Sequence, residues 1–392
     1  MEVYLVGGAV RDRLLGLPVA ERDWVVVGAT PQQLLDRGYT AVGRDFPVFL
    51  HPRTKEEYAL ARTERKTAPG YTGFAVCADP SITLEQDLLR RDLTINAMAE
   101  TADGTLIDPY GGRDDLDNGL LRHVSPAFAE DPVRILRVAR FAACLARYGF
   151  HVAHGTNALM RQMVDNGEVD HLVPERVWAE LHKALQCAAP SRFFAVLYGC
   201  GALARLFPEL VAVPGAAAPA AHGPAPLRLP VLERATVIRN DANIRFAALV
   251  CDIDNGREAG LSRPQLDALC DRLRIPNACR ELAGVALQHR ATAHRVADLD
   301  PAQILDLLGA LDAFRRGARL ADFIAVCAAE AQAADAAVHD YPPAQLLENA
   351  WQAASAVKPD TGGKSGPEIG AALRAQRIAA IEQARAQARP EQ

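Results

Sequence analysis

The hydrophobic pattern divides the chain into two regions of different texture. Over the first 110 residues, short apolar runs at 3–8, 24–28, 46–50 and 58–63 alternate with short helical stretches. Their β-branched and aromatic residues are typical of strands. Beyond residue 118 the chain is rich in Ala, Leu and Arg, with helical periodicity and almost no strand-like alternation. This order predicts an α+β fold, in which a mixed sheet with helices on one side precedes an all-helical region.

Two local signals predict particular elements in the first region. Thr30 followed by Pro31 predicts the start of a helix, because threonine caps helix N-termini and proline suits the first helical position. The segment 46–63 predicts a β-hairpin whose turn lies near residues 52–55.

Breaks in the pattern indicate how the helical region is divided. Residues 211–230 are dense in Ala, Pro and Gly and predict a linker or long loop, and a second break at 358–367 precedes a final helix at 368–388. We therefore expect a catalytic head at 1–118, a helical neck at 119–210, a helical body at 211–330 and a helical tail at 331–392.

Composition narrows the cellular setting. The eight cysteines are scattered without a Cys-x-x-Cys pair, which argues against a disulfide framework or a zinc knuckle and favours reduced thiols. The N-terminus has no basic segment before a long apolar run, and no apolar stretch is long enough to span a bilayer. These features predict a soluble cytoplasmic protein with no membrane partner.

The formal net charge of −5 does not suggest a general nucleic-acid binder, because affinity for phosphate backbones comes from clustered Lys and Arg. Any RNA site must therefore be a local basic patch. One candidate is the segment from Arg113 to Arg147, in which arginines recur at positions 122, 134, 137 and 140.

The first candidate site is the segment Gly7-Gly8-Ala9-Val10-Arg11-Asp12, where a strand ends and a helix begins. Paired glycines let backbone amides approach a phosphate, and a helix N-terminus favours negative charge. Gly8 and Arg11 could thus bind a triphosphate. A plain strand-to-helix turn is the alternative, since short glycine motifs recur by chance.

The second candidate site is Glu21-Arg22-Asp23, which leads directly into an apolar strand. Side chains two apart on an extended strand share a face, so Glu21 and Asp23 can hold a metal together while Arg22 faces away. Two hard oxygen donors beside a phosphate loop suit Mg²⁺. The alternative is a solvated, charged start of a strand.

Two further segments combine arginines with an acid. In the segment 90–97, Arg91 could bind phosphate or ribose, while Asp92 and Asn96 could take sugar hydroxyls or cap a helix.

In the segment 130–141, Asp131 is expected to be an N-cap and Pro132 the first helical residue. Arginines then recur every three residues on one face, opposite apolar residues. The arginines are Arg134, Arg137 and Arg140, and the apolar residues are Ile135, Val138 and Phe141.

Taken in order, GGAVRD, ExD, RRDLTINA, DPYGGRDDL and EDPVRILRVARF resemble the signature motifs of class II tRNA nucleotidyltransferases, bacterial CCA-adding enzymes of the polymerase β-like superfamily. The resemblance continues through 43–74, VPERVWAEL and RIAAIEQ, and so covers most of the chain. Several long motifs in a fixed order rarely coincide by chance. The resemblance implies template-independent addition and repair of the 3′-terminal CCA of tRNA from CTP and ATP, with release of pyrophosphate.

The resemblance also implies roles for single residues. Glu21 and Asp23 would ligate magnesium. Asp131 and Arg134 would act as a protein template that hydrogen-bonds the incoming base, and the loop 62–74 would help to switch from C to A addition. The residues implied to bind the nucleotide are Gly8, Arg11, Arg91, Arg137 and Arg140.

Two departures from the family pattern affect these expectations. The family has aspartate at the position of Glu21, and the longer side chain displaces the carboxylate by about one C–C bond, which predicts lower activity. Cys251-Asp252 stands where relatives with a phosphohydrolase domain have consecutive His and Asp. We therefore expect a degenerate HD-like body without phosphatase or cyclic phosphodiesterase activity.

Other activities fit parts of the pattern. A poly(A) polymerase-like enzyme would share the head and neck, but usually carries a strongly basic C-terminal extension, whereas the final helix expected here at 368–388 has mixed charge. A CC-adding or A-adding specialist and a catalytically weakened RNA-binding relic are further alternatives. For the main hypothesis the expected partners are ATP, CTP and the acceptor stem and T arm of tRNA, bound by a monomer or homodimer.

Overall fold

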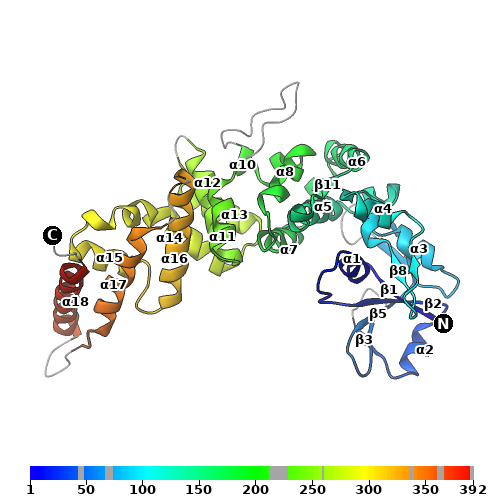
Figure 1. Cartoon of the computed structure of the whole chain (residues 1–392), viewed down its shortest axis with the longest axis horizontal. Coiled ribbons are helices and arrows are strands. Elements are labelled where there is room, and N and C mark those ends of the chain that lie inside the picture. The colour runs from blue at the N-terminus through cyan, green and yellow to red at the C-terminus, as the bar shows by residue number, and fades with distance from the viewer. Residues whose placement is uncertain are drawn as a thin grey trace. The chain divides into compact units, whose positions relative to one another are not determined.

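The computed structural model describes residues 1–42, 48–66, 74–211, 228–257, 260–335, 337, 340–359 and 366–388. The chain forms two compact units, Met1–Pro208 and Glu209–Gln392, which are described separately (Figure 1). The first unit contains a seven-stranded sheet followed by helices, and the described part of the second unit is helical. The predicted α+β fold is confirmed. The four-part division at residues 118, 210 and 330 stays a prediction.

The main sheet of the first unit has the strand order β3-β4-β5-β2-β1-β8-β9. Its pairs are antiparallel except for β2 and β5, which run parallel, so the sheet is mixed as predicted. The strands are β1 (Glu2–Val6), β2 (Asp23–Val27), β3 (Thr40–Val42), β4 (Val48–Leu50), β5 (Glu57–Leu60), β8 (Ala99–Glu100) and β9 (Leu106–Ile107).

Most of the expected local structure is confirmed. Strands β4 and β5 form the predicted hairpin, with Leu50 opposite Glu57 and a turn in which Lys55 has a φ of 62°. The Thr30 side chain caps the helix that begins at Pro31, and the Gln33 side chain in turn accepts the backbone N–H of Thr30. The two-residue strands β8 and β9 were not predicted, because so short a run shows no alternation.

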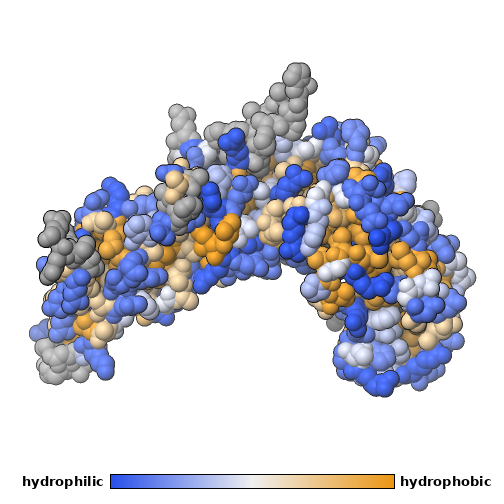
Figure 2. Space-filling view, in the orientation of Figure 1, coloured by the Kyte–Doolittle hydropathy of each residue, from blue (hydrophilic) through white to orange (hydrophobic). Residues whose placement is uncertain are grey.

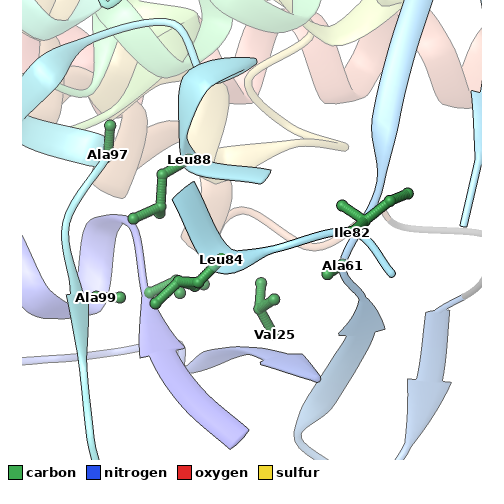
Figure 3. Close-up of a cluster of buried hydrophobic side chains, with 8 residues drawn as sticks. Val25, Ala61, Ile82, Leu84, Leu88, Ala97 and Ala99 are labelled. Atoms are coloured by element: carbon green, nitrogen blue, oxygen red, sulfur yellow. The ribbon is translucent and has the colours of Figure 1, made fainter. Parts of the chain in front are cut away.

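Alternate residues of β2 pack in separate cores, one on each face of the sheet. Val25 lies in a cluster with Leu84 and Leu88 of helix α3 (Leu84–Leu89) (Figure 3). Val26 lies in a second cluster that includes Leu34 of helix α2 (Pro31–Leu35). Helices therefore contribute to the packing on both faces, and the expectation of helices on one side is wrong. A strand buried on both faces shows a continuous apolar run, from which the number of covered faces is not apparent.

Helices surround the sheet and continue beyond it in the first unit. Helix α5 packs against α7 and α8. The helices are α1 (Gly8–Leu14), α2 (Pro31–Leu35), α3 (Leu84–Leu89), η1 (Thr94–Asn96), α4 (Gly112–Asp117), η2 (Pro126–Glu130), α5 (Val133–Cys144), η3 (Ala146–Tyr148), α6 (His154–Asp165), η4 (Glu168–His171), α7 (Pro174–Leu185), α8 (Ser191–Gly199), α9 (Ala202–Leu206) and α10 (Pro208–Val211). Two short ribbons complete the unit, antiparallel β6 (Thr63–Lys66) with β7 (Phe74–Cys77) and parallel β10 (Leu120–Leu121) with β11 (His151–Val152).

The second unit is built of paired helices, of which α12 packs against α14, α11 against α16 and α17 against α18. Within the predicted linker, residues 212–227 lie outside the described part of the chain, as do residues 360–365 of the second predicted break. The helices are α11 (Pro230–Ile238), α12 (Ala242–Asn255), α13 (Arg263–Arg272), α14 (Asn277–His294), η5 (Val296–Asp298), α15 (Pro301–Ala310), α16 (Gly317–Ala334), α17 (Pro342–Ala356) and α18 (Gly366–Ala388).

One disulfide corrects the expectation of reduced thiols. It joins Cys144 at the end of α5 to Cys187, which follows α7, with 4.5 Å between the two Cα atoms. The two cysteines are 43 residues apart, so their proximity depends on helix packing and is not visible in their spacing. The other described cysteines are free thiols.

None of the described helices combines the length and the apolar character needed to cross a membrane. Hydrophilic side chains are spread over the visible face of both units (Figure 2). The cytoplasmic location stays a prediction.

Candidate active site

A cavity of about 750 Å³ in the first unit brings the predicted site residues together. Nine basic and five acidic residues line it, although the whole chain has a net charge of −5. This local excess of positive charge favours an anionic ligand. The predicted residues that line the cavity are Gly8, Arg11, Glu21, Asp23, Arg91, Asp131, Arg134, Arg137 and Arg140.

The glycine pair forms the tight strand-to-helix turn that the sequence predicts. Gly7 has a φ of 72°, and its backbone N–H donates to the carbonyl of Met98. A Cβ atom at Gly7 would lie 3.0 Å from Nη1 of Arg91. Glycine at position 7 thus permits both the backbone conformation and the close approach of Arg91 to the turn.

Three carboxylates line the cavity at the start of the parallel strands. Glu21 precedes β2, which begins only at Asp23, and the paired register places Asp23 beside Glu57 on β5. Arg22 does not line this cavity, and its guanidinium lies 3.6 Å from Glu56. Glu57 was missed because the parallel pairing of β2 with β5 is not a local property of the sequence. The sequence shows only that Glu57 and Ala59 lie two residues apart and would therefore share a face of β5.

A nearby cation would stabilise the ionised carboxylate of Asp23. Partial burial by the cavity walls raises the pKa of Asp23, and the negative charge of Glu21 raises it further. Arg91 acts in the opposite direction but does not cancel the rise. Like charges held close together in a partly desolvated place are stabilised when a cation binds between them.

A hydrogen-bonded network joins the elements on two sides of the cavity. Arg11 on α1 donates from Nη1 to Oδ1 of Asn96 (2.7 Å), and Asn96 donates from Nδ2 to Asp92 (3.1 Å). Arg137 on α5 donates from Nε to the other Asp92 oxygen (2.7 Å). Asp92 also accepts the backbone N–H of Leu93. Asp92 and Asn96 both line the cavity, and these bonds show how they position the arginines.

The Asp92 carboxylate remains ionised although it is buried. Burial acts to raise its pKa, but Arg137 and the hydrogen bonds from Asn96, Arg137 and Leu93 outweigh burial and hold the pKa at about 2. Asp92 therefore supplies a fixed negative charge to this wall.

Helix α5 presents its arginines to the cavity, with two corrections to the predicted geometry. The helix begins at Val133, one residue later than expected, and Asp131 accepts the Val133 N–H at 3.0 Å. Phe141 lies on the cavity side with Arg137, one helical turn before it, and not on the opposite face. Residues i and i+4 share a helix face, so Phe141 follows Arg137. Ile135 and Val138 are buried, as predicted.

Helix α7 supplies two cavity residues, Arg176 and Lys183, and the buried Glu180 behind them, to which no role was assigned from the sequence. Arg176 donates to both oxygens of Asp131 (3.3 and 3.2 Å), and Glu180 accepts from Nε of Arg140 (2.6 Å). Lys183 also lines the cavity. The spacing 176, 180, 183 places all three on one helix face. The helical periodicity of this segment, which includes VPERVWAEL, predicts which residues share a face of α7. It does not show which helix packs against that face.

Residues 67–73 of the predicted switching loop lie outside the described part of the chain. Arg62, where that loop begins, lines the cavity, as does Arg90. Arg90 donates from Nε to the backbone carbonyl of Arg62 at 3.1 Å.

Comparison with known proteins identifies the family. The chain is 53% identical over 406 residues to a multifunctional CCA protein of Thioalkalivibrio sulfidiphilus, and the match covers 99% of both chains. The chain belongs to the multifunctional CCA protein family. The resemblance to CCA-adding nucleotidyltransferases is thereby confirmed. Two family models match parts of the chain, the poly A polymerase head domain at residues 3–122 and the probable RNA and SrmB-binding site of polymerase A at 149–213.

Solved structures of other CCA-adding enzymes share the fold at low sequence identity. The Thermotoga maritima CCA-adding enzyme complexed with tRNA_CCA is 20% identical with a TM-score of 0.63, covering 99% of this chain and 92% of its own. The Bacillus stearothermophilus CCA-adding enzyme in complex with CTP is 24% identical with a TM-score of 0.63, covering 97% and 89%. The family fold therefore extends over nearly the whole of this chain.

Replacement of Asp92 by Asn should destabilise the first unit in a pH-dependent way. Because the folded-state pKa is about 2, below the ordinary value of 3.8, the stabilisation is present above pH 3.8 and is lost as the pH falls from 3.8 through 2. We expect Asp92→Asn to cost about 2 kcal/mol at pH 7, with a smaller difference from wild type at pH 3.

Urea unfolding of a Trp351→Phe background would measure this difference, since the two remaining tryptophans, Trp24 and Trp178, both lie in the first unit. Exposed Asp165 provides the control, and Asp165→Asn should change stability little. A cost for Asp92→Asn that stays constant between pH 7 and pH 3 would contradict the assignment.

Proposed function

We propose that this chain adds and repairs the 3′-terminal CCA of tRNA from CTP and ATP without a nucleic-acid template. The observation that carries the proposal is that all nine predicted site residues line one basic cavity. The full-length match to a multifunctional CCA protein supports the same activity. Related structures in complex with tRNA_CCA and CTP support the choice of substrates.

Magnesium is the metal that the donor set fits best. Among the described residues, no three His, Cys, Asp or Glu side chains converge into a ready-made metal site. Mg²⁺ usually takes one or two carboxylates together with water and substrate phosphates, so Glu21 and Asp23 are a sufficient protein contribution. Glu57 lies in register with Asp23 and offers a further oxygen. When bound, the ions would activate the attacking 3′-hydroxyl and neutralise charge on the triphosphate and departing pyrophosphate.

Arg91 and Arg11 would bind the nucleotide near the glycine turn. In the described part of the chain, Nε of Arg91 is buried and has no hydrogen-bond partner, which is costly unless a ligand supplies an acceptor. A phosphate oxygen of the substrate would satisfy it. Gly8 lies beside Arg11, since a Cβ there would be at an ordinary contact distance of 3.5 Å from Nη2 of Arg11.

Asp131 and Arg134 would read the incoming base, with Arg137 and Arg140 also in contact with the nucleotide. Both Asp131 oxygens accept from Arg176, and Oδ1 also accepts the Val133 N–H, so Oδ2 retains a lone pair that could accept from the exocyclic amine shared by cytosine and adenine. Arg134 is fixed by donation to the backbone carbonyls of Ala127 and Arg90. Uracil and guanine present a carbonyl in place of that amine, which leaves the carboxylate without a donor.

Recognition of tRNA would fall to the helical parts of the chain. We infer that they bind the acceptor stem and T arm through phosphates and 2′-hydroxyls, because double-stranded RNA is recognised mainly by shape. The state as monomer or homodimer, and the role of the loop 62–74 in switching between nucleotides, stay predictions.

The second unit is proposed to be a degenerate HD-like body without phosphohydrolase activity. Asp252 accepts the backbone N–H groups of Val231 and Leu232, and burial raises its pKa to about 7 against these hydrogen bonds. Cys251 is fully buried, and burial raises the pKa of its thiol well above the usual value. A metal ligand must be deprotonated and accessible, so this Cys-Asp pair is poorly suited to replace His-Asp.

A group of charged side chains in the second unit forms ion pairs and hydrogen bonds among its own members. Arg290 donates to Asp254, to Asn255 (3.1 Å) and to Glu330 (2.9 Å). Glu330 also contacts Nε2 of His294 at 3.0 Å. This guanidinium supplies positive charge among oxygen groups that would otherwise attract a cation.

Extension of a tRNA that ends before CCA tests the main proposal. With CTP, ATP and Mg²⁺, we expect addition of C, C and A followed by arrest, resolved one nucleotide at a time on a gel. Glu21→Asp should extend severalfold faster, because the shorter side chain restores the carboxylate position of the family. Asp23→Asn should lose at least about a hundredfold in rate, since it removes a metal ligand.

The other outcomes of this assay separate the alternatives. Long A tails would favour a poly(A) polymerase-like enzyme, and arrest after CC would favour a CC-adding specialist. No extension by the wild type or by Glu21→Asp would favour an RNA-binding relic.

Asp131→Ala should relax base selection. Loss of the acceptor for the exocyclic amine should lower the preference for CTP over UTP by at least about tenfold, the equivalent of about 1.4 kcal/mol. Competition between the two nucleotides in single additions measures the ratio. Exposed Asp165→Ala serves as the control, and an unchanged ratio for Asp131→Ala would exclude Asp131 from base recognition.

The full-length protein should not hydrolyse p-nitrophenyl phosphate or 2′,3′-cyclic AMP above the buffer blank, with Mg²⁺, Mn²⁺ or Ni²⁺ added. We expect this because Asp252 already accepts hydrogen bonds from backbone N–H groups and Cys251 is buried, so neither is suited to bind a metal. Metal-dependent hydrolysis that persists in Asp23→Asn would contradict the proposal and indicate an active second unit.

A further inference from the structure

One aromatic ring in the cavity wall contacts three of the arginines. The guanidinium carbon of Arg140 lies 4.3 Å from the centroid of the Phe141 ring, that of Arg11 lies 5.0 Å away and that of Arg137 lies 5.7 Å away. Arg137, Arg140 and Phe141 belong to α5, whereas Arg11 comes from α1. Phe141 is therefore a point at which two separate elements of the cavity meet.

The ring is poorly placed to stack on a nucleobase. Phe141 is only 6% exposed, although it lines the cavity. Stacking on a base requires an open face of the ring, whereas the guanidiniums of Arg11, Arg137 and Arg140 surround this one. A ligand in the cavity would therefore meet the guanidiniums, and the ring would act on the ligand through them.

The carboxylates that pair with Arg137 and Arg140 leave most of the donors of these two arginines available, whereas Arg11 is bonded to Asp12 and Asn96. Arg137 donates from Nε to Asp92, and Arg140 donates from Nε to Glu180 at 2.6 Å. Among the described residues, the Nη groups of Arg137 and Arg140 donate to no protein atom. A guanidinium has five N–H donors, so the Nη groups of both arginines remain free for a ligand.

The Phe141 ring stabilises these guanidiniums without consuming donors. A cation–π contact uses the negative face of the ring, whereas a further hydrogen-bond acceptor would occupy N–H groups that the nucleotide needs. Three positive charges around one point also repel one another. The attraction of each to the same ring counters this repulsion and limits the directions in which each guanidinium can move.

We propose that Phe141 is a positioning residue for nucleotide binding, which holds the guanidiniums of Arg11, Arg137 and Arg140 in the cavity wall and directs the free Nη groups of Arg137 and Arg140 into the cavity. The inference rests on the proposed function, because it takes CTP and ATP as the ligands of this cavity. Phe141 contacts guanidiniums and not the base, so the loss of the ring should weaken the binding of both nucleotides by similar factors.

Direct binding of CTP and of ATP to the full-length protein tests the inference. Isothermal titration without tRNA should give a Kd about tenfold higher for Phe141→Leu with each nucleotide, because leucine keeps the apolar volume but has no π face. Phe141→Tyr retains the ring and should bind within about twofold of wild type. Phe193→Leu is the matched control, since Phe193 is fully buried in the first unit and packs against Phe194 and Phe207.

Thermal melting followed by circular dichroism checks that each variant is folded, and Phe141→Met replaces Phe141→Leu if the leucine variant is not. Unchanged affinity in Phe141→Leu would overturn the inference while leaving the proposed function intact. Equal weakening by Phe141→Tyr or by Phe193→Leu would also overturn it, because the effect would then come from packing. Failure of the wild type to bind either nucleotide would overturn the proposed function and the inference with it.

Discussion

The buried carboxylate of Asp92 is the constraint on which the cavity depends. A charge removed from water is tolerated only when it is paired and hydrogen-bonded, and Asp92 meets this condition with Arg137, Asn96 and the Leu93 backbone. Asn96 in turn accepts a hydrogen bond from Arg11, which joins Arg11 to the same network. The sheet side and the helix side of the cavity are thereby joined, and displacement of either side would leave a buried charge unpaired.

The same principle extends along α5 and α7. Arg137 and Arg140 of α5 have acidic partners on other elements, Asp92 and Glu180, and Asp131, just before α5, has the basic partner Arg176 on α7. Arg137 and Arg140 each pair with their carboxylate through Nε, which leaves their Nη groups available to a ligand. A strongly basic wall can thus be built into a chain whose net charge is negative.

The register of the strands determines where the carboxylates of the cavity lie. Asp23 begins β2 and is paired with Glu57 on the parallel strand β5, while Val25 two residues later enters the core with Leu84 and Leu88 (Figure 3). A shift of register by one residue would turn Asp23 to the other face and move Val25 out of its cluster. The core therefore fixes where the proposed magnesium ligands lie, and the ligands need no dedicated support of their own.

The sequence by itself determined the elements whose causes are local: the Thr30 cap, the hairpin of β4 and β5, the glycine turn before α1 and the arginine spacing of α5. Its ordered motifs also identified the family and nine residues that line one cavity. Tertiary structure alone decided the rest, because the causes are contacts between distant segments. Parallel pairing brought Glu57 to Asp23, and the packing of α5 on α7 brought Arg176 to Asp131 and Cys144 to Cys187. Periodicity tells which residues of a helix share a face, but only packing decides what that face meets, as it does for Phe141.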